Sequence, residues 1–379
     1  MADIFVNLFA TDGILIGTIV PFVIVLAVVV FVHEMGHYLV GRLCGIGVQA
    51  FSIGFGPELV GFNDRHGTRW KLSAIPLGGY VKFTGDMTVT SAPDSEEIEN
   101  LSEEERRVAF HTQPVWKRAA TVFAGPLFNF ILTAIVFAVL FAVYGKFISE
   151  PTVANVLPDS PAAQAGFMPG DRFVSMDGIK VSTFGDVQRY VSARAGDEIR
   201  FVVFRDGEEV ELIAIPEIVE QTDPLGNTIK IGLIGVQNDE SLGQPRIVEF
   251  TVLGAIGEAI SETGYVIVRT GHFLKRFATG REDKCQLGGP VKIADMAGKA
   301  AQKGIEWLVQ LTAFLSVGIG FLNLLPIPPL DGGHLVFYGY EAVARRPPSE
   351  RILELFYRAG LILVLGFMIF VFWNDIFGC

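Results

Sequence analysis

Two histidines and a glutamate stand at the end of an almost purely apolar run of the sequence. The run ILIGTIVPFVIVLAVVV, residues 14–30, continues into FVHEMGHYLV, residues 31–40, which contains His33, Glu34 and His37. Residues four apart share one face of a helix, so His33 and His37 can hold one Zn²⁺ ion. Glu34 can then act as the general base that deprotonates a zinc-activated water. Polar groups are costly in hydrocarbon, and a bound metal with its own charge gives them a reason to be there.

A catalytic zinc site needs a third protein ligand and keeps one position for water. The segment NLLPIPPLDGGH, residues 323–334, contains one carboxylate, Asp331, and we predict that it is this ligand. The prolines exclude a regular helix, and Gly332 and Gly333 permit an unusual backbone, which at membrane depth must be surrounded by protein or by a water-filled cavity. Two alternatives stay open: Asp331 caps the next helix, or His334 is the ligand in its place.

Two asparagines are predicted to lie at the same depth in the membrane. Asn129 and Asn323 could each hydrogen-bond a substrate backbone or polarise the oxyanion of a tetrahedral intermediate. For Asn129, a hydrogen bond between helices is an equal alternative. Asn323 precedes Asp331 by eight residues in the broken segment, so we favour it for a substrate contact.

The elements that position these residues are predicted to cross a membrane. The chain has 379 residues, of which 50% are hydrophobic and only 19% are charged, a composition that favours a membrane protein. The segments long enough to span about 30 Å of hydrocarbon are 14–40, 117–144, 305–325 and 353–373. The first lacks the basic start and the cleavage pattern of a signal peptide, so we expect it to be a retained transmembrane helix.

Charge and cysteine content exclude several other classes of protein. The net charge of −11 argues against nucleic acid as a partner. The three cysteines, Cys44, Cys285 and Cys379, are too few and too scattered for a disulfide framework or a cysteine-based zinc site. We interpret them as incidental.

The distribution of Lys and Arg predicts how the chain is oriented. The loops between spans one and two and between spans three and four are basic, whereas residues 1–13 and 374–379 contain neither Lys nor Arg. By the positive-inside rule both termini lie outside, those two loops are cytoplasmic, and residues 145–304 lie outside. Arg42 is nine residues after His33, or about 14 Å along a helix, which places the histidines inside the bilayer on its cytoplasmic side.

The long outer segment has the pattern of a small folded domain. The stretch SPAAQAGFMPGDRFVSMDG, residues 160–178, resembles bacterial PDZ domains of the protease-associated kind; we find one copy, at about 150–217, and a generic small β domain is the alternative. A hairpin is predicted around Asp206 and Gly207 because alternating apolar strands flank them. Another strand is predicted in IKIGLIGV, residues 229–236. Amphipathic helices near the membrane surface are predicted in residues 246–304.

Together these parts resemble the site-2 protease family of intramembrane zinc metalloproteases, of the bacterial RseP type. Besides the two motifs, the resemblance rests on FSIGFGPEL (51–59), WKLSAIPLGGYVKF (70–83), AGPLFNF (124–130) and LGGPVKIADMAG (287–298). One departure is that the best-studied enterobacterial type has two tandem PDZ domains.

The resemblance implies a role for each candidate residue. His33, His37 and Asp331 would bind zinc, and Glu34 would be the general base. The segment GTRWKLSAIPLGGYVKF would be a hairpin that dips toward the membrane, with Gly78 and Gly79 between its two halves, and would pair with the extended substrate. An ordinary surface hairpin is the alternative.

The expected fold is a polytopic α-helical membrane protein with four transmembrane helices, a membrane-associated β-hairpin and a small α/β PDZ-like extracytoplasmic domain. Its predicted parts are the first span with the hairpin region (1–116), the second span (117–145), the PDZ-like domain (146–217), a periplasmic strand and amphipathic helix region (218–304) and the last two spans (305–379).

The resemblance further implies an enzyme of the bacterial inner membrane that cleaves single-span membrane proteins. The expected substrates are an anti-sigma factor already trimmed by another protease and leftover signal peptides, and the PDZ-like domain would exclude bulky outer domains. One rival is a non-catalytic scaffold that binds tails, which the intact set of candidate ligands disfavours. Another is a metal transporter, which would need a polar path that spans two and four do not offer.

Overall fold

The computed structural model describes residues 15–85, 102–222, 228–238, 246–280 and 287–378. The N-terminal tail 1–13, Cys285 and Cys379 therefore lie outside the described residues. The chain forms two compact units, each described here by itself. Unit 1 comprises Met1–Phe137, Ala259–Thr270 and Leu287–Cys379, and unit 2 comprises Ala138–Glu258 and Gly271–Gln286.

Four helices in the described part of the chain are long and apolar enough to cross a membrane, which confirms the four predicted spans by length and composition. They are α2 (Val20–Leu43), α5 (Val115–Tyr144), α10 (Ile305–Asn323) and α12 (Glu350–Trp373). A π-helical turn, η1 (Leu15–Ile19), precedes α2, and another, η3 (Asn374–Gly378), follows α12.

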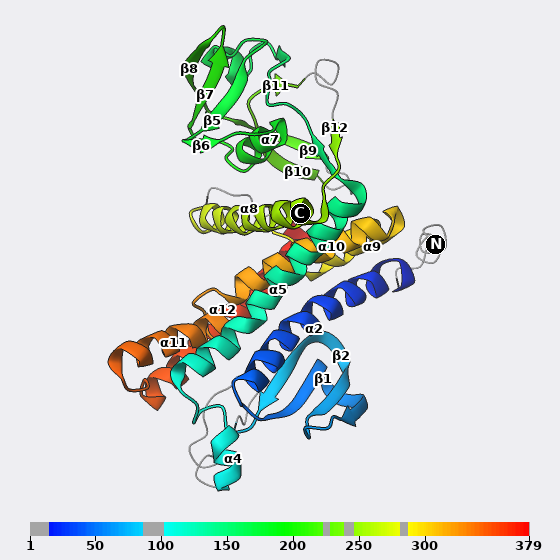
Figure 1. Ribbon diagram of the computed structural model, residues 1–379, viewed down its shortest axis with the longest axis vertical. Coiled ribbons are helices and arrows are strands. Elements are labelled where there is room, and N and C mark those ends of the chain that lie inside the picture. The colour runs from blue at the N-terminus through cyan, green and yellow to red at the C-terminus, as the bar shows by residue number, and fades with distance from the viewer. Residues whose placement is uncertain (1–14, 86–101, 223–227, 239–245, 281–286, 379) are drawn as a thin grey trace. The chain divides into compact units, whose positions relative to one another are not determined.

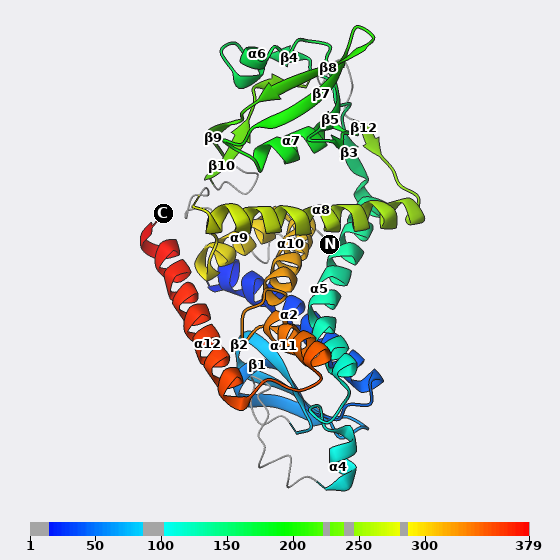
Figure 2. The ribbon, with the colours of Figure 1, turned by 90° about the vertical axis from the view of Figure 1, so that its left-hand side faces the viewer.

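Shorter or less apolar helices complete the helical part of the chain. They are α4 (Glu103–Val108), α8 (Val252–Ala278), α9 (Pro290–Lys303) and α11 (Asp331–Ala344). Within unit 1, α2, α9 and α10 pack against one another (Figure 2). The carboxylate of Asp375, just after α12, accepts hydrogen bonds from the backbone N–H groups of Gly289, Val291 and Lys292 at the start of α9. Within the region 246–304 predicted to be helical, α8 and α9 confirm helices, whereas residues 246–248 form a strand; the place of the helices at a membrane surface stays a prediction.

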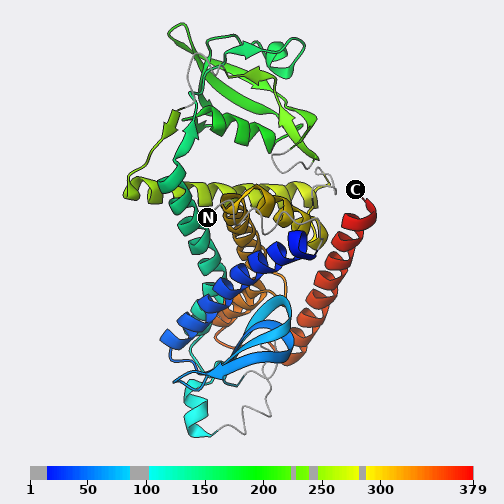
Figure 3. The same ribbon diagram turned by 90° about the vertical axis from the view of Figure 1, so that its right-hand side faces the viewer.

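A bent antiparallel pair of long strands, β1 (Val48–Asn63) and β2 (Arg69–Phe83), lies beside α2 (Figures 1 and 3). Residues 50–53 of β1 pair with residues 69–72 and also with residues 79–82 of β2. The two halves of β2 therefore lie on opposite sides of β1, and the prediction that they form a hairpin with each other was wrong. The physical reason is that β1 bends at Gly54, whose φ of 89° only glycine adopts readily, and inserts between them.

The turn between β1 and β2 is held by one carboxylate. Asp64 accepts hydrogen bonds from Tyr38 Oη on α2 at 3.0 Å and from Trp70 Nε1 at 3.1 Å, and also from the backbone N–H groups of His66 and Thr68. Although partial burial raises the pKa of Asp64, these hydrogen bonds outweigh it and hold the pKa well below its usual range. The turn is thus tied to the helix that carries the two histidines.

Unit 2 is built around an antiparallel four-stranded sheet in the order β6-β5-β7-β8. Its strands and short helices, in chain order, are β3 (Lys146–Ile148), β4 (Asn155–Val156), α6 (Pro161–Ala165), β5 (Arg172–Met176), β6 (Ile179–Lys180), α7 (Phe184–Ser192), β7 (Ile199–Arg205), β8 (Glu208–Ala214), β9 (Glu217–Thr222), β10 (Thr228–Leu233), β11 (Val236–Gln237) and β12 (Arg246–Val248).

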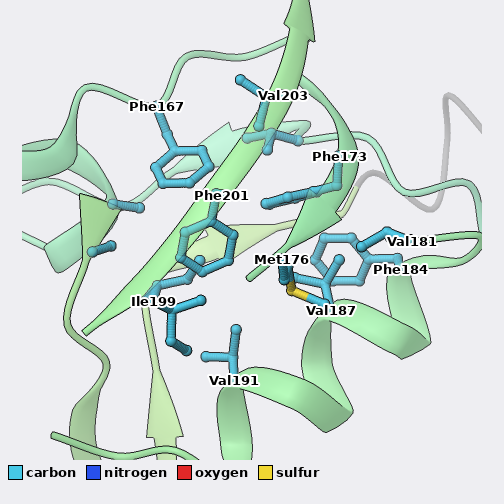
Figure 4. Packing of buried hydrophobic residues seen from close by; sticks show 14 residues of the cluster. Phe167, Phe173, Met176, Val181, Phe184, Val187, Val191, Ile199, Phe201 and Val203 are labelled. Atoms are coloured by element: carbon cyan, nitrogen blue, oxygen red, sulfur yellow. The ribbon is translucent and has the colours of Figure 1, made fainter. Parts of the chain in front are cut away.

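The sheet of unit 2 encloses a core of aromatic and branched side chains. Figure 4 shows Phe167, Phe173 and Phe201 packed together above α7. The hairpin β7–β8 turns at Asp206 and Gly207, as predicted, and the predicted strand after residue 218 is also confirmed.

Candidate metal centre and its cavity

Three side chains from two helices meet in unit 1 with the atoms that bind metals. His33 and His37 lie one turn apart on α2, and Asp331 is the first residue of α11. One candidate ligand atom from each lies within 4.8 Å of the others. Asp331 Oδ2 is 3.2 Å from Nε2 of His33 and 3.6 Å from Nε2 of His37, and the two Nε2 atoms are 3.2 Å apart. Among the described residues this is the one such group of His, Cys, Asp or Glu.

The far nitrogen of each imidazole contacts α5. His37 Nδ1 lies 2.9 Å from the carbonyl oxygen of Thr121, and because a carbonyl only accepts, this nitrogen carries the proton. Neutral His37 therefore presents the lone pair of Nε2 to the cluster. His33 Nδ1 lies 3.2 Å from Nδ2 of Asn129.

Gly125 allows α5 to pass directly behind both rings. A Cβ atom at this position would lie 2.2 Å from His37 Nε2 and 2.9 Å from His33 Cε1, which are distances that real contacts do not reach. Any larger residue would displace the two imidazoles, so this glycine is part of the geometry of the site.

The donor set fits a divalent metal ion of the zinc class. Two neutral imidazole nitrogens and one carboxylate oxygen are the ligands that catalytic zinc sites use. Asp331 Oδ2 is buried and is left without a hydrogen bond in the part of the chain that the structure describes, as expected of an atom reserved for a ligand. His33, His37 and Asp331 are the residues that would hold the ion.

The start of α11 is shaped by close backbone contacts and not by an unusual glycine backbone. Gly332 and Gly333 lie in the first helical turn, and a Cβ on Gly332 would lie 2.2 Å from the carbonyl oxygen of Leu325. The prolines end the preceding helix as predicted. The prediction of an unusual backbone at the two glycines was wrong, because these positions require glycine for lack of space for a side chain. The N-cap residue is Leu330, so the alternative that Asp331 is the cap does not hold.

A buried ion pair fixes the other end of α11. Arg118 on α5 donates to Glu341 at 2.7 Å, and its guanidinium lies 5.1 Å from the centre of the Tyr338 ring. Both charged side chains are at most 17% exposed. The pair therefore links the helix behind the histidines to the helix that carries Asp331.

A cavity of about 370 Å³ opens onto the three ligands. Glu34 and Asn323 both line it, and Asn323 Nδ2 is 3.4 Å from His33 Nε2. One wall is formed by the second half of β2, including Gly78, Gly79 and Val81, and the Glu34 carboxyl contacts the backbone N–H of Val81. In the described part of the sheet, residues 79–82 pair only with β1, so this half of β2 is an edge strand facing the cavity.

The structure brings together most of the residues predicted for the site, with two differences. His334 lines the cavity but is hydrogen-bonded to Tyr357 Oη at 3.0 Å and is not a member of the ligand group. Asn129 is fully buried behind His33 and is not among the described residues that line the cavity.

Sequence reasoning missed the contributions of Thr121 and Gly125. Both precede Asn129 at spacings of four residues on α5, so they share its face, and the glycine within an apolar helix was the available signal. The role of the Thr121 carbonyl could not have been predicted from the sequence, because every residue type has the same backbone carbonyl.

Comparisons with known proteins agree with this geometry. The family model "Peptidase family M50" matches residues 21–367. A relative from Mesorhizobium japonicum, assigned by name to the zinc metalloproteases, is 72% identical over 96% of this chain and 100% of its own length. The "Metalloprotease MmpA" of Caulobacter vibrioides is 41% identical over 94% of this chain and 95% of its own.

One solved structure matches a small part of the chain. The PDZ domain of the SdrC-like protein from Listeria monocytogenes is 18% identical, covers 26% of this chain and 94% of its own, and gives a TM-score of 0.19. An overlap of this quality carries no argument, so unit 2 is described from its own strands and helices.

Proposed function

The chain belongs to peptidase family M50 and is a zinc metalloprotease of the site-2 protease type, and from this premise we propose that it cleaves transmembrane segments of single-span membrane proteins. The observation that carries the proposal is the position of the metal centre. The motif that supplies His33, Glu34 and His37 lies within a helix apolar enough to span a membrane. A peptide bond cleaved there must itself come from a membrane-spanning segment.

Different residues of the chain carry out different parts of the hydrolysis. The chemistry that zinc supplies in such a site is Lewis-acid activation of water and of the scissile carbonyl. Glu34 takes the proton from the attacking water and delivers it to the leaving amine, a role that requires it to face the same cavity as the ligands. Asn323 donates a hydrogen bond from Nδ2 to the oxyanion that develops at the attacked carbonyl.

The edge strand of β2 holds the substrate extended. A transmembrane helix hides its peptide bonds in its own hydrogen bonds, so it must be unwound before it can be cut. Pairing with residues 79–82 satisfies the freed N–H and C=O groups, and the open edge of the sheet faces the ligand group across the cavity. Gly79 lets this edge strand pack closely against α2 beside Glu34, because a Cβ on Gly79 would lie 2.9 Å from Val30 Cγ1 and 3.1 Å from Glu34 Cγ.

We further propose a multi-pass protein of the bacterial inner membrane with both termini periplasmic and the active site toward the cytoplasm. The support is the distribution of Lys and Arg, which are abundant in the loops that follow α2 and α11. The substrate classes we propose are a trimmed anti-sigma factor and signal-peptide remnants, and the support for them is the resemblance of the whole chain to the RseP type.

Unit 2 has the proposed role of a PDZ-like gate that excludes substrates with bulky outer domains. Deleting residues 152–216 and rejoining the ends should leave cleavage of a trimmed substrate intact and should permit cleavage of an untrimmed one. If the deletion variant bound zinc and stayed folded but cleaved neither substrate, the gate proposal would fail.

Cleavage of a synthetic transmembrane peptide in liposomes tests the proposed activity. The products are identified by mass spectrometry, and we expect a scissile bond inside the apolar segment. Cleavage only in soluble flanking sequence would show that the enzyme is not an intramembrane protease.

Substitution of Gly79 tests the strand-pairing step. Gly79→Val should lower kcat/KM about 10-fold or more with zinc content unchanged, because its side chain would meet Ser52 and Glu34 and close the edge. Gly67→Val is the control at the turn of the same sheet: a Cβ at Gly67 meets nothing within 4 Å, and its φ of 83° adds a backbone strain that Gly79→Val lacks, so this variant gives an upper limit for the effect of strain. Equal losses in both variants would assign the effect to the backbone of the sheet and not to substrate pairing.

A further inference from the structure

The side chain of Asn129 lines neither the described cavity nor the proposed path of the substrate. It lies inside α5 with 0% of its surface exposed. Its Nδ2 is 3.2 Å from His33 Nδ1, the ring nitrogen that points away from Asp331. Its Oδ1 is buried and has no hydrogen-bond partner in the described part of the chain. A buried amide with an unpaired oxygen costs free energy unless that oxygen has another use.

The backbone of Asn129 is fixed, so only its amide group is free to turn. The carbonyl oxygen accepts hydrogen bonds from Thr133 Oγ1 at 3.0 Å and from Ser316 Oγ at 2.9 Å. Across the interface, Gly320 on α10 leaves room for the side chain, since a Cβ there would lie 3.0 Å from Asn129 Cβ. The amide therefore stays beside His33 whichever way its oxygen and nitrogen point.

We propose that Asn129 is the positioning residue of His33 and holds its ring with Nε2 toward Asp331. When Nε2 of a neutral imidazole binds a metal, Nδ1 bears the hydrogen and needs an acceptor. A half-turn of the amide exchanges its two ends and brings Oδ1 to that nitrogen. No hydrogen bond to Oδ1 opposes this rotation in the described part of the chain.

An asparagine suits this task because it both donates and accepts. Its amide lies 3.2 Å from His33 Nδ1, and with Oδ1 turned to that nitrogen it accepts from Nδ1–H, which leaves the lone pair of Nε2 for a metal. His37 has a backbone acceptor for the same purpose, because the Thr121 carbonyl can only accept and keeps the proton on Nδ1. His33 is thus the ligand whose second ring nitrogen depends on a side chain, which a substitution can remove. The inference rests on the proposed function, since it takes the ligand group to be a zinc site.

The test compares zinc affinity and histidine tautomer in three variants of the full-length protein in detergent. Asn129→Leu removes the hydrogen bond, Asn129→Asp can only accept one, and Thr312→Val is a control that removes a buried hydroxyl bonded to its own helix. We expect N129L to raise the Kd for zinc about 10- to 100-fold, measured by competition with a chelator, and T312V to leave it unchanged. N129D should bind zinc at least about 10-fold more tightly than N129L.

Nitrogen NMR of ¹⁵N-histidine-labelled protein reads the tautomer directly. We expect His33 to be protonated at Nδ1 in the zinc-loaded wild type and in zinc-loaded N129D. His33 bound to zinc through Nδ1 and protonated at Nε2 in zinc-loaded N129D would overturn the proposal even if N129L failed to fold.

Three further results would also overturn the proposal. An N129L variant with wild-type zinc affinity but reduced kcat/KM would mean that Asn129 serves the substrate. Equal loss of affinity in N129L and T312V would mean that it serves packing alone. A wild-type protein that binds no zinc would overturn the proposed function and this proposal with it, whereas the first two results leave the proposed function standing.

Discussion

Replacing Gly125 by alanine should damage the metal centre although it changes none of the ligand residues. The added methyl carbon would lie 2.2 Å from His37 Nε2 and 2.5 Å from His37 Cε1. Ordinary contacts between such atoms are about 3.5 Å, so the ring or the helix must move by about 1 Å. A displacement of that size at reacting groups costs about 10²-fold in rate. We therefore expect kcat/KM to fall at least about 100-fold and zinc to be bound more weakly.

The assay is zinc content by atomic spectroscopy together with cleavage of a transmembrane peptide. The control is Gly318→Ala on α10, the same change in another membrane-spanning helix, where a Cβ meets nothing within 4 Å. We expect the control to retain its zinc and its rate. If G125A kept both as well, the close packing of α5 behind the histidines would not be part of the site.

Two further predictions concern the third ligand and the turn of the sheet. Asp331→Ala should lose stoichiometric zinc, whereas His334→Ala should keep it because His334 pairs with Tyr357; the reverse pattern in a metal analysis would reassign the ligand. Asp64→Asn should lower the unfolding temperature at pH 7. Because hydrogen bonds depress the folded-state pKa of Asp64 below its unfolded value, its contribution is complete above about pH 4 and is lost as the pH falls further. The difference between wild type and variant should therefore shrink in thermal melts below pH 4, and a constant difference would contradict this origin.

The membrane helices and the metal ligands could be predicted from the sequence because each has a local signal. In lipid, the backbone N–H and C=O groups of a long apolar run find hydrogen-bond partners within the run only if it forms a helix. The spacing of His33 and His37 places both on one face of that helix. Asp331 was predicted because it is the one carboxylate in a segment that prolines exclude from the helix. All three residues lie together in the structure.

The contacts between elements could not be predicted in the same way. Both halves of β2 could be predicted as strands from the sequence. The insertion of residues 50–53 between them could not be predicted, because pairing between distant strands has no local sequence pattern. For Asn129 the sequence left open a substrate contact and a hydrogen bond between helices, and only the packing of α5 against α2 shows that its amide meets His33 and not the cavity. Gly332 was read as a backbone feature, whereas its neighbour Leu325 shows that it is needed for space.

The most direct test of a metal-dependent protease at this site is Glu34→Gln, measured for zinc content and for peptide cleavage in one preparation. Glu34 lines the cavity but is not a member of the ligand group, so the variant should retain zinc at the wild-type ratio. Its cleavage rate should fall about 10²- to 10⁴-fold, because the proton of the attacking water has lost its acceptor. A Glu34→Gln protein that binds zinc and cleaves at the wild-type rate would contradict the account.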